Sequence, residues 1–173
     1  MTTIRHTLLP KQYDFVRSDA REVLYSGAYA AGKTRALCYR LVARAQVSGC
    51  REGLCRKHLV TLKASTLRTL LEPDGNAPPV LPLGSYEHNK SEKVIRIRGG
   101  GEIVYFGLDD PQKIGSYNLT GCAIDEAVEL TLDDWHMLIG RIRLDVGVPN
   151  SLYAVCNPGA PSHWLAERFG LAL

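Results

Sequence analysis

The sequence contains no apolar run that could cross a membrane. A membrane-spanning helix needs about 18 or more consecutive apolar residues, and the longest runs in this 173-residue chain hold only a few. Residues 1–6 also lack the apolar stretch of a secretory signal peptide. We therefore expect a protein that is not secreted and has no membrane partner.

The cysteines show no metal-binding or disulfide pattern. Their number is odd, no two have Cys-x-x-Cys spacing, and the closest pair, Cys50 and Cys55, has only His58 nearby. A structural zinc site needs four convergent ligands, so neither zinc nor a disulfide framework is expected. The sequence instead predicts buried, reduced thiols at Cys38, Cys50, Cys55, Cys122 and Cys156.

Composition and length are those of one ordinary globular domain. Hydrophobic residues make up 45% and charged residues 23% of the chain, which excludes a disordered protein, and the length predicts a single domain over residues 1–173. Residues 1–72 hold 13 Lys/Arg against 5 Asp/Glu, a net +8, whereas residues 73–173 hold 8 against 13, a net −5. The basic half suits a polyanionic partner such as nucleic acid, although solvated helix faces give the same pattern.

Short β-like runs alternate with helical patterns, which predicts an α/β domain with a mostly parallel sheet flanked by helices. Thr131 and Asp134 form a capping box for one helix, whose apolar stripe extends to Ile142. The Pro- and Gly-rich segment 72–85 predicts a long surface loop. We expect strands at 22–26, 53–57, 122–124 and 152–156, a β-hairpin at 93–106 with Gly99–Gly101 at its tip, and helices at 33–48, 59–71, 131–142 and 161–170.

The strongest functional pattern is the glycine-rich segment Gly27-Ala28-Tyr29-Ala30-Ala31-Gly32-Lys33-Thr34. It matches G-x-x-x-x-G-K-[ST] at every fixed position and lies between a predicted strand and a predicted helix. Glycines let the loop wrap a phosphate, and the loop N–H groups and the helix N-terminus then point at the anion. Lys33 can reach the β- and γ-phosphates of a nucleotide, and the Thr34 hydroxyl can bind Mg²⁺.

Two adjacent carboxylates follow the short apolar strand Cys122-Ala-Ile124. Asp125 stands at the carboxyl end of this strand, where it can hold Mg²⁺ through the water shell of the ion. Glu126 stands beside it and can orient and deprotonate an attacking water. After a phosphate loop, this pair predicts hydrolysis of ATP.

Two amide side chains are further candidates. Gln12, about fifteen residues before the loop, offers the donor and acceptor that an adenine edge requires. Asn157 follows the last predicted strand and precedes Pro158, at the sheet edge where a side chain can sense the γ-phosphate or the attacking water. The guanine-recognition sequence Asn-Lys-x-Asp is absent, which argues against a GTPase.

These motifs together resemble the N-terminal ATPase domain of phage large terminase subunits, the motors that package viral DNA. The resemblance runs from about Leu8 to Phe169. It is carried by Gln12, the loop Gly27 to Thr34, Arg56-Lys57, Pro111-Gln-Lys-Ile-Gly115, Asp125-Glu126-Ala127, and Asn157-Pro158 followed by His163-Trp164.

The resemblance implies a RecA-like P-loop fold of the ASCE class, in which a catalytic Glu stands beside the Mg²⁺-linked Asp. It implies ATP and Mg²⁺ as ligands, with Gln12 as the adenine contact, Asp125 and Glu126 as the Mg²⁺ and catalytic carboxylates, and Asn157 as the coupling residue. It further implies double-stranded DNA, a portal protein and a small terminase subunit as partners, a homo-oligomeric ring when assembled and a monomer in isolation, and a location in the host cytoplasm.

The sequence departs from the family at the cations expected near the nucleotide. Family phosphate loops often carry an Arg where this chain has Ala28 to Ala31, and many members place an Arg before the Asp-Glu strand. The cationic finger that a neighbouring subunit would insert is therefore not assigned. Lys113, Arg141 and Arg143 are its candidates, and Arg51, Arg56, Lys57, Lys63 and Arg68 are the candidates for a DNA-tracking surface.

Large terminases also carry a C-terminal nuclease domain, for which 173 residues leave no room. We expect one ATPase domain, no nuclease activity and a lid that is truncated after the Asn157 motif. Three alternatives stay open: a DEAD/DEAH-like helicase domain, a nucleotide-gated DNA clamp without turnover, and a small-molecule kinase. The sequence lacks the Ser-Ala-Thr type motif that a helicase domain would show after the next strand, which argues against a helicase. Glu126, the candidate catalytic residue, argues against a clamp without turnover. A kinase would require an Arg-rich lid, and none follows Arg143.

Overall fold

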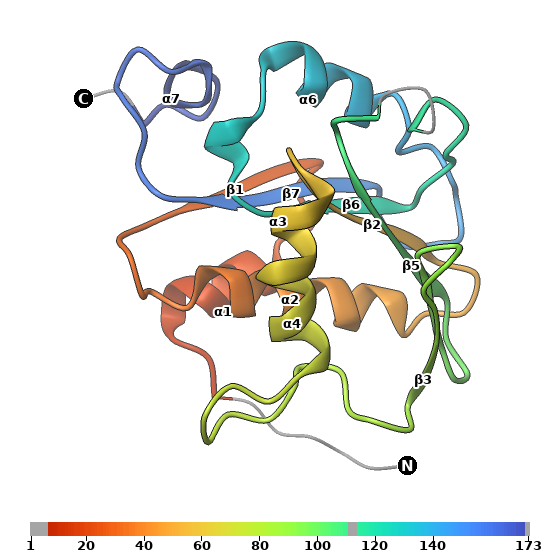
Figure 1. Cartoon of the computed structure of the whole chain (residues 1–173). Coiled ribbons are helices and arrows are strands. Elements are labelled where there is room, and N and C mark those ends of the chain that lie inside the picture. The colour runs from red at the N-terminus through yellow and green to blue at the C-terminus, as the bar shows by residue number, and fades with distance from the viewer. Residues whose placement is uncertain (1–6, 111–113, 172–173) are drawn as a thin grey trace.

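The computed structural model describes residues 7–110 and 114–171 and contains one seven-stranded sheet with helices on both faces (Figure 1). The strand order is β1-β7-β6-β2-β5-β4-β3. The first five strands are parallel, and β4 and β3 continue the sheet in antiparallel pairing. The strands are β1 (Glu22–Ser26), β2 (Arg51–Arg56), β3 (Tyr86–Asn89), β4 (Val94–Ile97), β5 (Glu102–Gly107), β6 (Gly121–Ile124) and β7 (Ser151–Cys156).

The predicted fold class is confirmed: a mainly parallel sheet, flanking helices and an antiparallel hairpin, β4–β5. Helices α1, α2, α3 and α4 lie on one face of the sheet, and η1, α6 and α7 lie on the other (Figure 1). The helices are α1 (Pro10–Arg17), α2 (Lys33–Ala45), α3 (Leu59–Ala64), α4 (Thr66–Leu71), η1 (Ala127–Glu129), α6 (Leu132–Ile139) and α7 (Trp164–Arg168). No helix in the described part of the chain is long and apolar enough to span a membrane.

Each face of the sheet has its own apolar core, because successive strand residues point to opposite sides. In β6, Ala123 packs in the core beneath α2, while Cys122 and Ile124 pack in the core beneath α6 and α7. All four residues of this strand are buried, as the apolar run predicted. The five cysteines are likewise buried thiols, as expected.

Three local predictions require correction. The helix expected over 59–71 is two helices, because the backbone of Ser65 leaves the helical region (φ −123°, ψ −80°). The helix expected to reach Ile142 keeps its Thr131–Asp134 capping box but ends at Ile139. The segment expected to be a long surface loop over 72–85 is a loop, but it does not lie wholly at the surface, since Val80 and Leu81 are buried.

The glycine-rich hairpin tip also has a packing role. A Cβ on Gly101 would lie 2.1 Å from the carbonyl oxygen of Cys50, and one on Gly100 would lie 2.7 Å from that of Ala45. Glycine is therefore required for the hairpin to approach the end of α2 this closely. The tip lies at the amino end of β5, at the sheet edge opposite the predicted nucleotide loop.

A buried ionic network fixes that edge of the sheet to α2. The fully buried carboxylate of Glu52 accepts hydrogen bonds from Arg44 Nε (3.1 Å) and from the hydroxyl of Tyr153 (2.7 Å). Burial raises the pKa of the Tyr153 hydroxyl well above its ordinary value, so Tyr153 remains a donor. Arg40, one helical turn before Arg44, is buried over the same Tyr153 ring at 4.7 Å.

We expect Glu52→Ala to lower the free energy of unfolding by about 3–5 kcal/mol, because it leaves the buried hydroxyl of Tyr153 without its acceptor and removes the charge partner of Arg44. Glu102→Ala is the matched control: it also removes a strand carboxylate that pairs with an arginine, Arg51, but 28% of the Glu102 side chain is exposed. Its cost is expected to stay below about 1 kcal/mol. Urea denaturation measures both, and equal costs would contradict a special role for the buried pair.

A second ionic group ties α6 and α7 to the start of β1. The carboxylate of Glu22 accepts from Trp135 Nε1 (2.7 Å) and from Arg168 Nε (2.7 Å) and Nη2 (2.8 Å). The hydrogen bond from Arg168 holds the pKa of Glu22 below its ordinary value.

A carboxyl group with a lowered folded-state pKa stabilises the fold above its unfolded pKa, about 4.3. This contribution is lost as the pH falls through the lowered folded value. We therefore expect Glu22→Gln to be destabilising at pH 7 and to approach the wild type in stability as the pH falls below about 4. Denaturant unfolding across this range checks the sign; a difference that grows on acidification would contradict it.

Candidate functional site

The predicted phosphate loop connects β1 to α2 at the carboxyl edge of the sheet. Gly27 N donates to the carbonyl oxygen of Cys156 (3.3 Å), and Gly32 immediately precedes α2 with a left-handed backbone (φ 68°, ψ 23°). Ala30 is also left-handed, with φ 59°. The side chain of Tyr29 is 84% exposed. Residues 27–34 thus have the strand–loop–helix setting that the motif requires.

Lys33 lies beneath this loop, with only 8% of the residue exposed. Its Nζ donates to the carbonyl oxygens of Gly27 (2.8 Å) and Ala28 (2.6 Å) and to Asn157 Oδ1 (2.8 Å). An ammonium group has three protons, so each of them has an acceptor. A phosphate that accepts a hydrogen bond from Lys33 must therefore displace one of these partners.

Asp125 is the most buried carboxylate of the predicted site, at 2% exposure. Its Oδ1 accepts from Glu126 N (3.1 Å) and Thr34 Oγ1 (3.3 Å), and its Oδ2 accepts from Thr66 Oγ1 (2.5 Å). Burial raises the pKa of Asp125, while these hydrogen bonds and the charge of Arg56 oppose the increase. Thr34 and Asp125, ninety-one residues apart in sequence, thus form one cluster of oxygen atoms.

Glu126 has a left-handed backbone (φ 51°, ψ 56°), which is strained for a residue with a side chain. Burial, and then the neighbouring charge of Asp125, raise the pKa of Glu126. Asn157 Nδ2 lies 3.5 Å from Glu126 Oε1, while its Oδ1 contacts Lys33. The amide of Asn157 thus lies between the lysine of the phosphate loop and the candidate catalytic carboxylate.

The sheet order explains this convergence. Strand β7 lies between β1 and β6, so the carboxyl ends of the three strands are neighbours. Asn157 follows β7, the phosphate loop follows β1 and Asp125 follows β6. Ligands of open α/β sheets bind at such edges.

Gln12 lies in α1 beside the loop. Its Nε2 donates to the carbonyl oxygen of Ala31 (3.1 Å), and its Oε1 accepts from Leu9 N (3.0 Å). A carboxamide has two protons and two lone pairs, so one donor and one acceptor position are not occupied by these two contacts. Gln12 is thus fixed against the loop while it keeps the hydrogen-bonding capacity of an adenine contact.

The cations proposed to track DNA are mostly paired within the chain. Arg56 makes two hydrogen bonds to Glu129, at 2.7 and 2.9 Å, which raise the pKa of its guanidinium. The other ion pairs are Arg51–Glu102, Lys57–Asp134 and Arg68–Glu72, and Lys63 lies exposed on α3. The predicted basic surface is therefore largely neutralised where these pairs form.

The structure describes two of the three candidates for the cationic finger. Lys113 lies outside the described residues. Arg141 and Arg143 were expected on a helix, but α6 ends at Ile139 and both follow it. Arg141 Nη1 donates to the carbonyl oxygen of Gly115 (2.7 Å), while Arg143 is exposed.

Two residues of the family-like tail have structural roles. His163 caps α7, since its Nδ1 accepts from Leu165 N (3.2 Å). Trp164 Nε1 donates to the carbonyl oxygen of Leu130 (2.8 Å), and its ring packs edge-on against Trp135. The segment after Asn157 is thus tied to the α6 side of the sheet.

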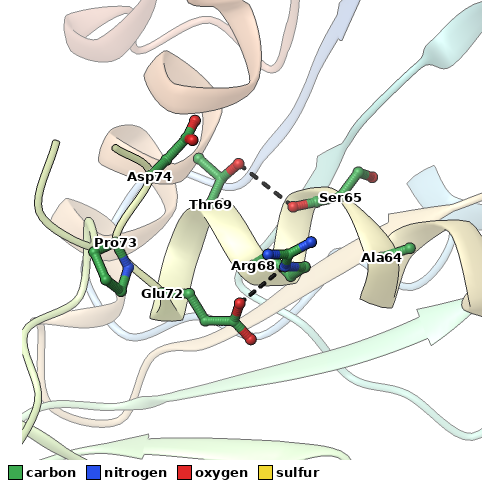
Figure 2. Close-up of a pocket in the computed structure, with 7 residues that line it drawn as sticks. All are labelled: Ala64, Ser65, Arg68, Thr69, Glu72, Pro73 and Asp74. Carbon is green, nitrogen blue, oxygen red and sulfur yellow. Dashed lines mark hydrogen bonds and ion pairs between the residues drawn. The ribbon is translucent and has the colours of Figure 1, made fainter. Parts of the chain in front are cut away.

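The surface pocket in Figure 2 is lined by residues other than those of the predicted nucleotide site. It is formed by the end of α3, by α4 and by the chain that follows, and contains none of the predicted site residues. Its residues are Ala64, Ser65, Arg68, Thr69, Glu72, Pro73 and Asp74. A second hollow follows Asn157 and is lined mainly by Pro158 to Pro161 and by α7.

Sequence reasoning missed three residues that contact the site. Thr66 holds Asp125, Ser65 accepts from Arg56 Nη1 (3.2 Å), and Glu129 binds Arg56. None belongs to a recognisable motif. Only the position of Glu129, three residues after Glu126, could have drawn attention to it.

The comparisons with known proteins agree with this fold. The mainly parallel sheet and the structural matches define a RecA-like fold of the ASCE class. The family model described as phage terminase large subunit matches residues 19–170, so the chain belongs to that family. Among curated proteins, no sequence matches the chain.

Solved large terminases share the fold at low sequence identity. The large terminase of a thermophilic bacteriophage is 19% identical, with a TM-score of 0.74 over 94% of this chain and 42% of its own. The complex of that terminase with ATP-gamma-S is 20% identical, with a TM-score of 0.70 over 95% and 41%. The large terminase of bacteriophage HK97 is 16% identical, with a TM-score of 0.69 over 96% and 37%. The chain therefore spans less than half the length of these proteins.

The two fixed glycines of the loop are expected to differ in their tolerance of alanine. A Cβ on Gly32 would lie 2.7 Å from Gln12 Nε2, and its positive φ strains any other residue by about 1–2 kcal/mol. A Cβ on Gly27 would meet nothing closer than 3.8 Å. Gly32→Ala should therefore lower the free energy of unfolding by at least about 1 kcal/mol, and Gly27→Ala by less than about 0.5 kcal/mol. Chemical denaturation of both variants tests this prediction. Equal losses of unfolding free energy would contradict the conclusion that only Gly32 must be glycine.

Proposed function

We propose that this chain is the ATP-hydrolysing motor domain of a phage large terminase subunit, which drives double-stranded DNA into a procapsid. One observation carries the proposal: Lys33, Thr34, Asp125, Glu126 and Asn157, from three separate strand ends, meet within hydrogen-bonding distance at one sheet edge. Family membership and the ATP-gamma-S complex of a structural relative support it.

The loop and Lys33 would bind the nucleotide phosphates. The N–H groups of the loop and the N-terminus of α2 attract anions. Because every proton of Lys33 already has an acceptor, binding of a β- or γ-phosphate releases one partner. Asn157 is the one partner among them with a side chain that can reorient, so its release would transmit phosphate binding to Glu126.

Thr34 and Asp125 fit Mg²⁺, which prefers a few protein oxygens together with phosphate oxygens and waters. Within the described residues no group of three His, Cys, Asp or Glu side chains is arranged to hold a metal ion. When bound, the ion would neutralise phosphate charge. Thr34 and Asp125 would hold it, and Lys33 would add a second positive charge to the site.

Glu126 is the proposed general base. Its left-handed backbone turns the chain directly after the Mg²⁺-binding residue, and its carboxylate faces Asn157. A carboxylate in this position would take the proton of the attacking water, and the oxygen of that water would attack the γ-phosphorus while the bond from this phosphorus to the β-phosphate oxygen breaks and ADP leaves. Lys33 would then bind the phosphates, while Asn157, released from Lys33, would contact the carboxylate of Glu126.

The partners and location are part of the proposal. Double-stranded DNA, a portal protein, a small terminase subunit and a ring of like subunits are proposed from family membership, with the host cytoplasm as the location. The ion pairs of Arg51, Arg56, Lys57 and Arg68 direct the DNA contact away from these side chains. Exposed Lys63 is the remaining candidate of the set.

Glu126→Gln should abolish ATP turnover while ATP binding persists, because the amide keeps the shape of the side chain but cannot accept the proton. A loss of at least about 100-fold is expected for removal of a general base. Asp133→Asn is the matched control: it also neutralises an acidic residue, but at an exposed position in the first turn of α6, and should leave turnover unchanged.

Turnover is measured with and without double-stranded DNA, with single-stranded RNA as the comparison. Stimulation by duplex DNA supports the motor. Stimulation by RNA alone would favour a helicase. Binding of ATP without turnover by the wild type, even at the concentrations that assemble a ring, would leave a nucleotide-gated clamp in place of the motor.

A further inference from the structure

A hydroxyl outside every sequence motif makes the shortest contact to the buried Asp125. Thr66 Oγ1 lies 2.5 Å from Asp125 Oδ2, and Thr66 is fully buried. A carboxylate only accepts hydrogen bonds, so the threonine is the donor. The other oxygen, Oδ1, contacts Thr34 Oγ1 and the backbone N–H of Glu126. Thr66 thus holds one oxygen, and the other stays on the side of the phosphate loop.

The position of Thr66 depends on the break between α3 and α4. Thr66 is the first residue of α4, and Ser65, directly before it, has the non-helical backbone that separates the two helices. The Ser65 hydroxyl donates to the carbonyl oxygen of Thr61 (2.8 Å) and accepts from Arg56 Nη1 (3.2 Å). Arg56, the last residue of β2, therefore holds Ser65 in place at the break between α3 and α4.

Ser65 positions Thr66 through the backbone that joins them, and not through a hydrogen bond between their hydroxyl groups. The two hydroxyl oxygens lie 3.4 Å apart, but each group has one proton. The proton of Ser65 is used on Thr61 and that of Thr66 on Asp125. Arg56 can thus act on Asp125 only by fixing where α4 begins.

These contacts close a ring around the two carboxylates. Arg56 is held by both oxygens of Glu129, the last residue of η1, and η1 follows Glu126 directly. The ring runs from Asp125 through Glu126 and η1 to Glu129, and returns through Arg56, Ser65 and Thr66. The turn that carries both carboxylates is therefore held at each end.

We propose that Thr66 is a positioning residue for the magnesium-binding carboxylate, and that Arg56 and Ser65 position Thr66. The inference rests on the proposed function, because it requires Asp125 to hold Mg²⁺. With Oδ2 fixed by Thr66, the carboxylate cannot rotate away from Thr34. The oxygens that receive the ion are thus arranged before it arrives, which strengthens its binding.

The test compares ADP affinity with Mg²⁺ and with EDTA, by calorimetry, for the wild type, Thr66→Val and Thr66→Ser. Mg²⁺ raises ADP affinity by a certain factor in the wild type, and in Thr66→Val this factor is expected to be at least fivefold smaller. The affinity of Thr66→Val for ADP in EDTA is expected to stay within twofold of the wild type. Thr66→Ser keeps the hydroxyl and is expected to retain the gain.

Thr69→Val is the matched control. It makes the same change one turn further along α4, where the Thr69 hydroxyl faces the carbonyl oxygen of Ser65 (Figure 2), at 3.4 Å. It should leave both affinities unchanged. If circular dichroism shows that Thr66→Val does not fold, Thr66→Ala removes the same hydroxyl together with the γ-methyl group and is tested in its place.

The outcomes separate this inference from the proposed function. A full gain from Mg²⁺ in the variant without the hydroxyl overturns the inference. So does an equal loss of affinity with Mg²⁺ and with EDTA, which indicates a structural role only. Absence of ADP binding by the folded wild type in both conditions overturns the proposed function itself.

Discussion

The nucleotide site depends on how helix α2 is fixed along the sheet. A helix that packs through apolar contacts alone can slide, since those contacts have little directionality. Here Lys33 and Thr34 lie at one end of α2. Toward the other end, the buried Arg40 binds Ser151 and the partly buried Arg44 binds Glu52. Directional hydrogen bonds at the far edge of the sheet thus set where the phosphate loop begins.

Elements with a local signal were predictable, and those defined by their partners were not. Strand β1 and helix α2 follow from apolar periodicity beside a glycine loop. Strand β3, Tyr86–Asn89, was missed because Tyr-Glu-His-Asn has no apolar alternation; its pairing with β4 makes it a strand. The break at Ser65 was missed because the leucine pattern continues across it, whereas the bonds of Ser65 to Thr61 and Arg56 exist only in the folded chain.

The candidate site divides in the same way. Residues 27–34, Asp125, Glu126 and Asn157 could be assigned because each stands at a strand end that the sequence marks. The structure adds which of them touch: Asn157 contacts both Lys33 and Glu126. Thr66 could not be found, because it is an ordinary helix residue until the tertiary fold carries it to Asp125. The ion pairs that neutralise the basic half also form between distant elements, such as Arg56 and Glu129.

Strand β1, which precedes the phosphate loop, is the second element in chain order. It is nevertheless among the last strands that can join the sheet. Strand β1 lies at the sheet edge and, in the described part of the chain, pairs with β7, Glu22 opposite Leu152 and Ser26 opposite Cys156. Until residues 151–156 have been synthesised, β1 has no strand of this sheet to join. Such long-range pairing is slow to form. Residues 27–34 therefore reach their folded position beside Asn157 only after most of the chain has been synthesised.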